Sequence, residues 1–203
     1  MKIELSYNAE AFTKTEAYRA IMRLRAGEEL YGKDLDGLLL YFAPSIPKKP
    51  KSNMDWLSMA CSTDAHTYSD VKRFIHVHDG KGYSTDGCRA HCAPVDLVDG
   101  CYCPYTHTLV EGGSNQWEML DRVLTIPKDA VKFGIADVKK EAKEGHKGVT
   151  VNYRLPGSVT FNGGYFGQAI SIGEPDALFR SEDGRTLYGK VGDNVFCMAG
   201  LRE

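Results

Sequence analysis

Histidine and cysteine side chains gather in the middle of this sequence, between residues 76 and 107. His76 and His78 are two residues apart and would lie on the same face of a strand. Thiolate and imidazole groups are the ligands that zinc selects in proteins. A zinc site is therefore one chemistry that the segment allows, and its candidate ligands are His76, His78, Cys88, His91, Cys92, Cys101, Cys103 and His107.

The spacing of the cysteines does not favour zinc. The sequence has no Cys-x-x-Cys pair, and Cys101 and Cys103 are separated by one residue. Cys88 and Cys92 are four apart on a predicted strand, which would hold their sulfurs too far apart for one ion. We interpret most of these cysteines as reduced and buried, where they act as small apolar residues. We predict no metal and no cofactor, and keep a small zinc-binding protein as an alternative.

An acid–base site is the second chemistry to weigh. Asp79, Asp86 and Asp99 lie near His76 and His91 in the sequence. Each aspartate precedes a glycine, however, and hydrogen bonding within a turn explains Asp-Gly pairs. The nearby glycines do not form a phosphate-binding Gly-x-Gly-x-x-Gly motif, and no nucleophile elbow, Walker loop or His-Glu-x-x-His motif occurs. The sequence predicts a protein that is not an enzyme.

A β-hairpin is the strongest local prediction. Strand Val71–His78 reaches a turn at Asp79–Gly82, and the chain returns as strand Tyr83–Cys92. Asp-Gly between alternating apolar residues favours such a turn. The return strand alternates, with Arg89 and His91 on one face and the other face formed by Cys88, Ala90 and Cys92.

The other elements predict an α+β protein of two similar strand–helix–meander halves. A turn-rich joint near residues 111–115 divides the halves, so that the first spans residues 1–112, with an excursion at about 35–53, and the second spans 113–203. The first half contains a strand at Lys2–Tyr7, a helix at about Ala9–Arg25 and a possible strand at Leu35–Phe42. The second half contains a strand at Arg122–Ile126, a helix from Pro127 to about Glu144, strands Val149–Leu155 and Val159–Phe161, a helix at Tyr165–Ile172, and a meander of Ala177–Arg180, Thr186–Val191 and Asn194–Leu201.

The run Thr85-Asp86-Gly87-Cys88-Arg89 resembles the Ala-Thr-Asp-Gly-His-Arg-Leu strand of bacterial and phage DNA sliding clamps. Further features follow in the order of that family. Arg122–Pro127 resembles its Arg-Val linker, Phe161–Phe166 its Phe-Asn-x-x-Tyr helix start, and Phe196–Arg202 its closing Met-Pro-Met-Arg strand. Cys88 replaces the usual histidine and the closing proline is displaced, so we expect a divergent, phage-encoded relative.

The resemblance implies a pocket that receives short linear peptides of polymerases and other partners. A thioether and an aromatic ring would form an adaptable apolar floor, and an arginine at the rim would bind a peptide carbonyl or carboxylate. Carried over by position, the walls of this pocket are Thr85, Gly87, Cys88, Arg89, Ala90, Arg122, Val123, Phe196 and Met198.

Clamps turn basic helices toward duplex DNA and contact its phosphates without reading bases. On the predicted helix after Pro127, several lysines share the face opposite an apolar stripe, and the first helix carries further arginines. A solvated helix face is the plainer interpretation of such a stripe. The candidate DNA-facing residues are Arg19, Arg23, Arg25, Lys132, Lys139, Lys140 and Lys143.

Size and charge fit this reading. The chain has 203 residues, 42% of them apolar, and a net charge of −2, so any DNA contact must come from a local basic patch. No stretch approaches the ~18 apolar residues of a membrane span, which predicts a cytoplasmic protein. We expect a clamp-like factor of DNA replication or repair that assembles as a homo-oligomer. A monomeric phage clamp mimic that binds host replication or defence proteins is the alternative.

Overall fold

The computed structural model describes residues 16–28, 49–62, 69–145 and 148–201. The chain divides into two compact units, one of Met1–Ser45 with Thr63–Thr67 and the other of Ile46–Ser62 with Tyr68–Glu203. The described element of the first unit is helix α2 (Glu16–Arg25), which is the second part of the predicted helix. The predicted strands Lys2–Tyr7 and Leu35–Phe42, and the excursion up to residue 48, lie outside the described residues.

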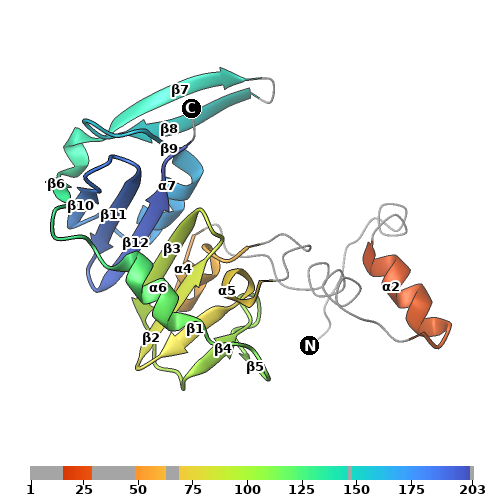
Figure 1. The fold of residues 1–203 in the computed structure, drawn as a ribbon. Coiled ribbons are helices and arrows are strands. Elements are labelled where there is room, and N and C mark those ends of the chain that lie inside the picture. Colours follow the sequence, from red (N-terminus) through yellow and green to blue (C-terminus); the bar gives the residue numbers. More distant parts are fainter. Residues whose placement is uncertain (1–15, 29–48, 63–68, 146–147, 202–203) are drawn as a thin grey trace. The chain divides into compact units, whose positions relative to one another are not determined.

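The second unit is built on a nine-stranded antiparallel sheet in the order β5-β4-β1-β2-β3-β12-β11-β10-β6 (Figure 1). Its strands are β1 (Ile75–His78), β2 (Lys81–Thr85), β3 (Arg89–Pro94), β4 (Gly100–Tyr102), β5 (Leu109–Val110), β6 (Val131–Phe133), β10 (Ala177–Arg180), β11 (Thr186–Val191) and β12 (Asn194–Ala199). A second sheet has the order β7-β8-β9, formed by Lys139–Gly145, Gly148–Arg154 and Thr160–Asn162. The predicted α+β class is confirmed.

Helices lie against both faces of the large sheet. They are α4 (Asn53–Ser58), α5 (Asp70–Arg73), α6 (Trp117–Leu124) and α7 (Gly163–Ala169), with 3₁₀ turns η1 (Ile135–Asp137) and η2 (Ile170–Ile172). One core joins α4 and α7 to the sheet and contains Trp56, Phe166, Phe196 and Met198. A smaller core lies under α6, where Leu120 and Leu124 pack on Tyr83, Ala90 and Cys197.

The predicted return strand Tyr83–Cys92 is wrong as one element, because it is two strands joined by a turn. Strand β2 ends at Thr85 and β3 begins at Arg89. The Asp86 carboxylate accepts hydrogen bonds from the backbone N–H groups of Cys88 and Arg89, and Gly87 has φ of 93°. Such local bonds from Asp, together with a left-handed glycine, turn the chain. The start of the predicted strand Val71–His78 is likewise not a strand, because residues 71–73 belong to the short helix α5 (Asp70–Arg73).

The predicted helix from Pro127 to Glu144 is also wrong. The segment contains strand β6, the turn η1 and strand β7. Val131 and Ile135 have helical spacing but are exposed, so they do not mark a buried helix face. The charged run from Lys139 instead pairs along its whole length with the alternating strand β8. The predicted strand Arg122–Ile126 is wrong as well, since Arg122 and Val123 belong to α6.

The C-terminal predictions are confirmed with small shifts at the boundaries. Strands β10 and β11 have the predicted limits, while β12 ends at Ala199 instead of Leu201. Helix α7 begins two residues earlier than predicted, because the Asn162 side chain accepts the Tyr165 N–H and caps it. Strands from before and after residue 112 share the large sheet, and the division into two similar halves stays a prediction.

Two glycines of α7 provide a test of this packing. A Cβ at Gly163 would collide with the backbone carbonyl oxygen of Val151 in β8, whereas a Cβ at Gly167 would meet nothing within 4 Å. We expect Gly163→Ala to lower the free energy of unfolding by about 1–3 kcal/mol, as overpacking does. Gly167→Ala should leave it unchanged or raise it by up to about 1 kcal/mol. Urea denaturation measures both, and equal effects would contradict the docking of α7 on β8.

Candidate functional site

The hairpin and the C-terminal strand meet in the large sheet. Strand β3 pairs antiparallel with β12, and Arg89 and Met198 are direct Cα partners in that register. The next pair along the ladder is Ala90 with Cys197. Segments that are more than one hundred residues apart in the sequence are therefore neighbours, as the predicted pocket requires.

Arg89 is buried, with 7% of its side chain exposed, and its guanidinium has several partners. Nε lies 3.1 Å from the Asp86 carboxylate, and the two terminal nitrogens donate to the Gln168 side chain and to the Met59 carbonyl. The guanidinium also lies over the Tyr165 ring, 4.2 Å from its centroid. Burial lowers the pKa of Arg89, and the charge of Asp86 opposes that shift. All three nitrogens already have partners within the chain.

The residues of the predicted pocket do not share one surface. Arg89, Phe196 and Met198 are buried in the core beneath α4 and α7. Ala90 is buried on the opposite sheet face, under α6, and Thr85 is buried at the end of β2. The remaining residues, which are exposed, are Gly87 and Cys88 in the turn and Arg122 and Val123 on α6.

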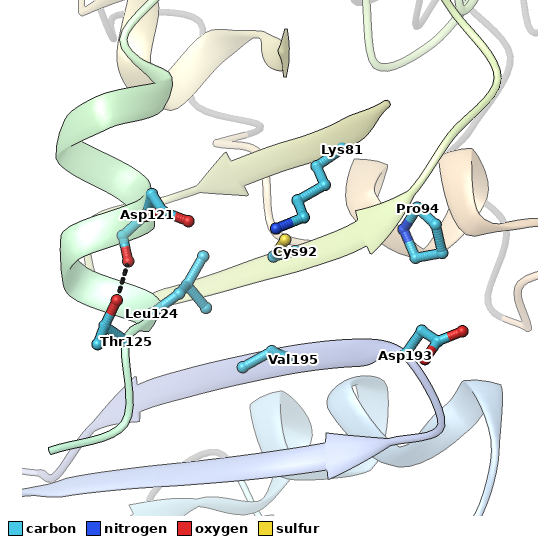
Figure 2. A pocket seen from close by; sticks show the side chains of 8 residues that line it. All are labelled: Lys81, Cys92, Pro94, Asp121, Leu124, Thr125, Asp193 and Val195. Atoms are coloured by element: carbon cyan, nitrogen blue, oxygen red, sulfur yellow. Dashed lines mark hydrogen bonds between the residues drawn. The ribbon is translucent and has the colours of Figure 1, made fainter. Parts of the chain in front are cut away.

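A groove lies beside α6 on the sheet face that this helix covers (Figure 2). Its volume is about 390 Å³, within the range of about 300–1,000 Å³ that is typical of ligand sites. Leu124, Cys92 and Val195 supply its apolar surface. The remaining lining residues are Lys81, Pro94, Asp121, Thr125 and Asp193.

The groove and the exposed part of the predicted pocket lie on opposite flanks of α6. Asp121 lines the groove, and Val123 is two residues further along the helix, which is about 200° around its axis. Figure 2 shows Lys81, at the start of β2, and Asp193, before β12, on one side of helix α6. Both strands run from that side toward the helix. The turn at residues 86–88 therefore belongs to the other flank.

The polar groups in and beneath the groove are the Asp121 carboxylate, the Tyr83 hydroxyl and the Cys92 thiol. The Tyr83 hydroxyl donates to the Asp121 carboxylate over 3.1 Å. Burial raises the pKa of the Cys92 thiol to about 11, although the nearby Lys81 ammonium opposes that shift, so Cys92 is a neutral thiol at neutral pH. Burial also raises the pKa of Tyr83. The floor is thus uncharged and the charges lie around it.

The groove residues differ by one position from the residues predicted by the sequence in two of three segments. Leu124 lines the groove beside the predicted Val123, and Val195 lines it beside the predicted Phe196. The alternation of β12 carries the missing signal, because residues 195 and 197 face α6 while residues 196 and 198 face the other core. Only the packing of both sheet faces reveals which set is covered.

The histidine and cysteine candidates are dispersed. Among the described residues, no three side chains of His, Cys, Asp or Glu are grouped as a metal site requires. Two of the candidates are in contact, since the Cys101 sulfur lies 3.5 Å from His76 Nδ1. His76 Nδ1 also accepts the Gln116 N–H, and Nε2 donates to the Asp70 carbonyl, so this ring is a structural link.

The other candidate histidines also have structural partners. His78 donates from Nδ1 to Asp99 over 2.6 Å and stacks on Trp117. The Ser58 hydroxyl donates to the Met54 carbonyl and lies 3.1 Å from His107 Nε2, so its proton is not available to the imidazole. These contacts explain the residues without catalysis.

The basic candidates do not form the predicted helix face. Arg19 and Arg25 are exposed on α2, and Arg23 lies 2.7 Å from Glu28 on the same unit. The lysines are on strands, with exposed Lys132 in β6, exposed Lys139 and Lys140 in β7, and Lys143 further along β7. None of the described helices is long and apolar enough to cross a membrane.

No protein-family model and no curated protein matches the chain. Seven chains among the solved structures are similar to it, and they include the following two. One is the β chain of DNA polymerase III from Streptococcus pneumoniae, with 10% identity and a TM-score of 0.48, and the match covers 74% of this chain and 62% of that one. The other is a DnaN sliding clamp from Bartonella birtlesii bound to griselimycin, with 16% identity and a TM-score of 0.44, covering 74% of this chain and 63% of that one. The matched part is thus less than two thirds of either clamp chain.

His91 provides a test of the core next to the site. Its ring is fully buried, stacks on Trp56 at 4.0 Å between centroids and donates from Nδ1 to the Trp56 carbonyl. Burial, together with the charge of Arg89, lowers the pKa of His91 from 6.5 to about 3. Below pH 6.5 the unfolded chain therefore binds a proton that the folded chain does not.

We expect the free energy of unfolding to fall as the pH drops from 6.5, by up to about 1.4 kcal/mol per pH unit for this residue. In His91→Phe, which keeps a ring against Trp56 but cannot titrate, the decline should be shallower. Urea denaturation at several pH values between 7.5 and 4.5 measures both slopes. Equal slopes would show that His91 is not the group responsible.

Proposed function

We propose that this chain is a non-enzymatic, clamp-like factor of DNA replication or repair that docks short peptide segments of partner proteins. The observation that carries the proposal is the convergence of three segments on one sheet face. These are the β2–β3 segment, helix α6 and strand β12, which correspond to the Thr-Asp-Gly-x-Arg, Arg-Val and closing motifs of the sliding-clamp resemblance.

The groove beside α6 is the docking site that the geometry favours. It is concave, its floor of Cys92, Leu124 and Val195 is apolar and uncharged, and it lies between helix α6 and strands β2, β3 and β12. Small aliphatic side chains and a thiol accept varied apolar side chains of a peptide without demanding one shape. Arg89 has no place in this docking, because its nitrogens are bonded within the core.

The same substitution on the two flanks of α6 tests this site. Thr125→Trp places a ring at the rim of the groove, and Val123→Trp places it on the other flank, where the sequence resemblance had put the pocket. The probe is a fluorescent peptide, Gly-Leu-Gln-Leu-Phe-Gly, with three apolar side chains. We expect Thr125→Trp to weaken binding at least tenfold, measured by fluorescence anisotropy, and Val123→Trp to change it less than twofold.

The opposite result, with binding lost in Val123→Trp and kept in Thr125→Trp, would move the docking site to the other flank of the helix. Failure of the unmodified protein to bind the peptide would overturn the docking function. Thermal unfolding of both variants identifies a loss that comes from misfolding, since both positions are exposed.

Contact with duplex DNA is the second part of the proposal. Lys139 and Lys140 are exposed on β7. Among the predicted DNA-facing residues they are the two that are consecutive in the sequence. Each lysine–phosphate contact contributes about 0.9 to the slope of log affinity against log salt. A closed ring around DNA would need several copies of this chain, and light scattering with and without duplex DNA measures that assembly.

The double variant Lys139→Gln/Lys140→Gln should reduce the salt slope of DNA binding by up to about 2. Its matched control is Lys49→Gln/Lys51→Gln, which removes two exposed charges elsewhere in the same unit. We expect the control to bind as the unmodified protein does. A monomer that shows no salt-sensitive DNA binding would leave the clamp mimic, which binds proteins only, as the function.

A further inference from the structure

The groove beside α6 is lined by one lysine, Lys81. Lys81 forms no ion pair with any carboxylate of the described residues, although Asp121 and Asp193 also line the groove. It is exposed at the start of β2. Figure 2 shows its side chain extending over the floor of the groove, with the ammonium beside the Cys92 sulfur.

The sheet register explains why this ammonium lies over the floor. Lys81 pairs with Pro94 and Tyr83 pairs with Cys92, so Lys81 and Cys92 are diagonal neighbours on one face of adjacent strands. The effect of the Lys81 charge on the Cys92 thiol is consistent with this proximity. In the position that Figure 2 shows, the ammonium would lie against a chain segment that covers Cys92 and Val195.

The two carboxylates of the groove are placed differently. Asp121 projects from α6 and accepts the Tyr83 hydroxyl, so one of its oxygens already has a donor. Asp193 is exposed in the turn before β12, and Figure 2 shows its side chain directed away from Lys81. Neither lies within 4 Å of the lysine nitrogen.

Covering an unpaired charge with an apolar segment costs free energy, because the charge loses its water. A carboxylate on the covering segment would offset that cost by a charge-assisted hydrogen bond. We propose that the segment docked in this groove is acidic, with a glutamate or aspartate next to its aliphatic anchor, and that Lys81 binds that carboxylate. This inference rests on the proposed docking function and names the chemistry of the partner.

Three peptides that differ at one position test the inference. The probes are Gly-Leu-Gln-Leu-Phe-Gly and its variants with Glu or Lys in place of Gln, each with blocked ends. We expect the Glu peptide to bind at least tenfold more tightly than the Gln peptide, and the Lys peptide to bind more weakly than both. Added sodium chloride should reduce the preference, since the pair is near the surface.

Lys81→Met removes the charge while keeping a long, flexible side chain. We expect this variant to bind the Glu and Gln peptides equally, within twofold, and Lys49→Met to retain the full preference. If Lys81→Met retained the preference, or the unmodified protein did not distinguish Glu from Gln, the inference would be overturned. Asp121→Asn explains one way in which the unmodified protein could fail to distinguish Glu from Gln. If this variant prefers the Glu peptide, Lys81 binds Asp121 in the unmodified protein when a peptide covers the groove.

The outcomes separate this inference from the function on which it rests. Binding of the Gln peptide without any preference for Glu would reject the acidic partner and keep peptide docking. Binding of none of the three peptides would reject both.

Discussion

The buried guanidinium of Arg89 is the interaction on which the arrangement around the site depends. It joins the β2–β3 turn through Asp86, the end of α4 through the Met59 carbonyl, and helix α7 through Gln168 and the Tyr165 ring. A buried charge costs free energy unless its donors have partners, so these bonds favour the close packing of the three segments. Each of its three nitrogens therefore already donates to a group of the core, which makes Arg89 a structural link on this sheet face.

The opposite face of the sheet is only partly covered. The strand alternation sends Phe196 and Met198 into the core with α4 and α7, and Val195 and Cys197 toward α6. Helix α6 has only eight residues and covers part of β2, β3 and β12. Where it ends, Cys92 and Val195 remain accessible beside Leu124, and this accessible strip is the floor of the groove.

The histidines and cysteines show how a cluster in the sequence can become a set of structural links. His76 connects β1 to the segment before α6, His78 stacks on Trp117, and His91 supports Trp56 in the core. Burial keeps His76 and His91 neutral by lowering their pKa values. Residues that suggested metal chemistry by their types instead fix the helices on the two faces of the sheet.

The sequence by itself determined the elements whose signals are local. The alternating strands β8, β10 and β11 and the Asp-Gly turns could be predicted because period-two alternation and turn chemistry act over a few residues. The α+β class also followed from the sequence. The lysine-rich segment after Pro127 was mistaken for a helix because Val131, Ile135 and Val138 have helical spacing, whereas pairing with β8 decided its conformation.

Only the tertiary structure decided which residues line the groove. The sequence placed the β2–β3 segment, α6 and β12 together through a family resemblance, and the β3–β12 ladder does join two of them. The choice between Val195 and Phe196, or between Leu124 and Val123, depends on which sheet face is closed by the core and which flank of α6 is open. Those are properties of packing between distant segments, and no local pattern contains them.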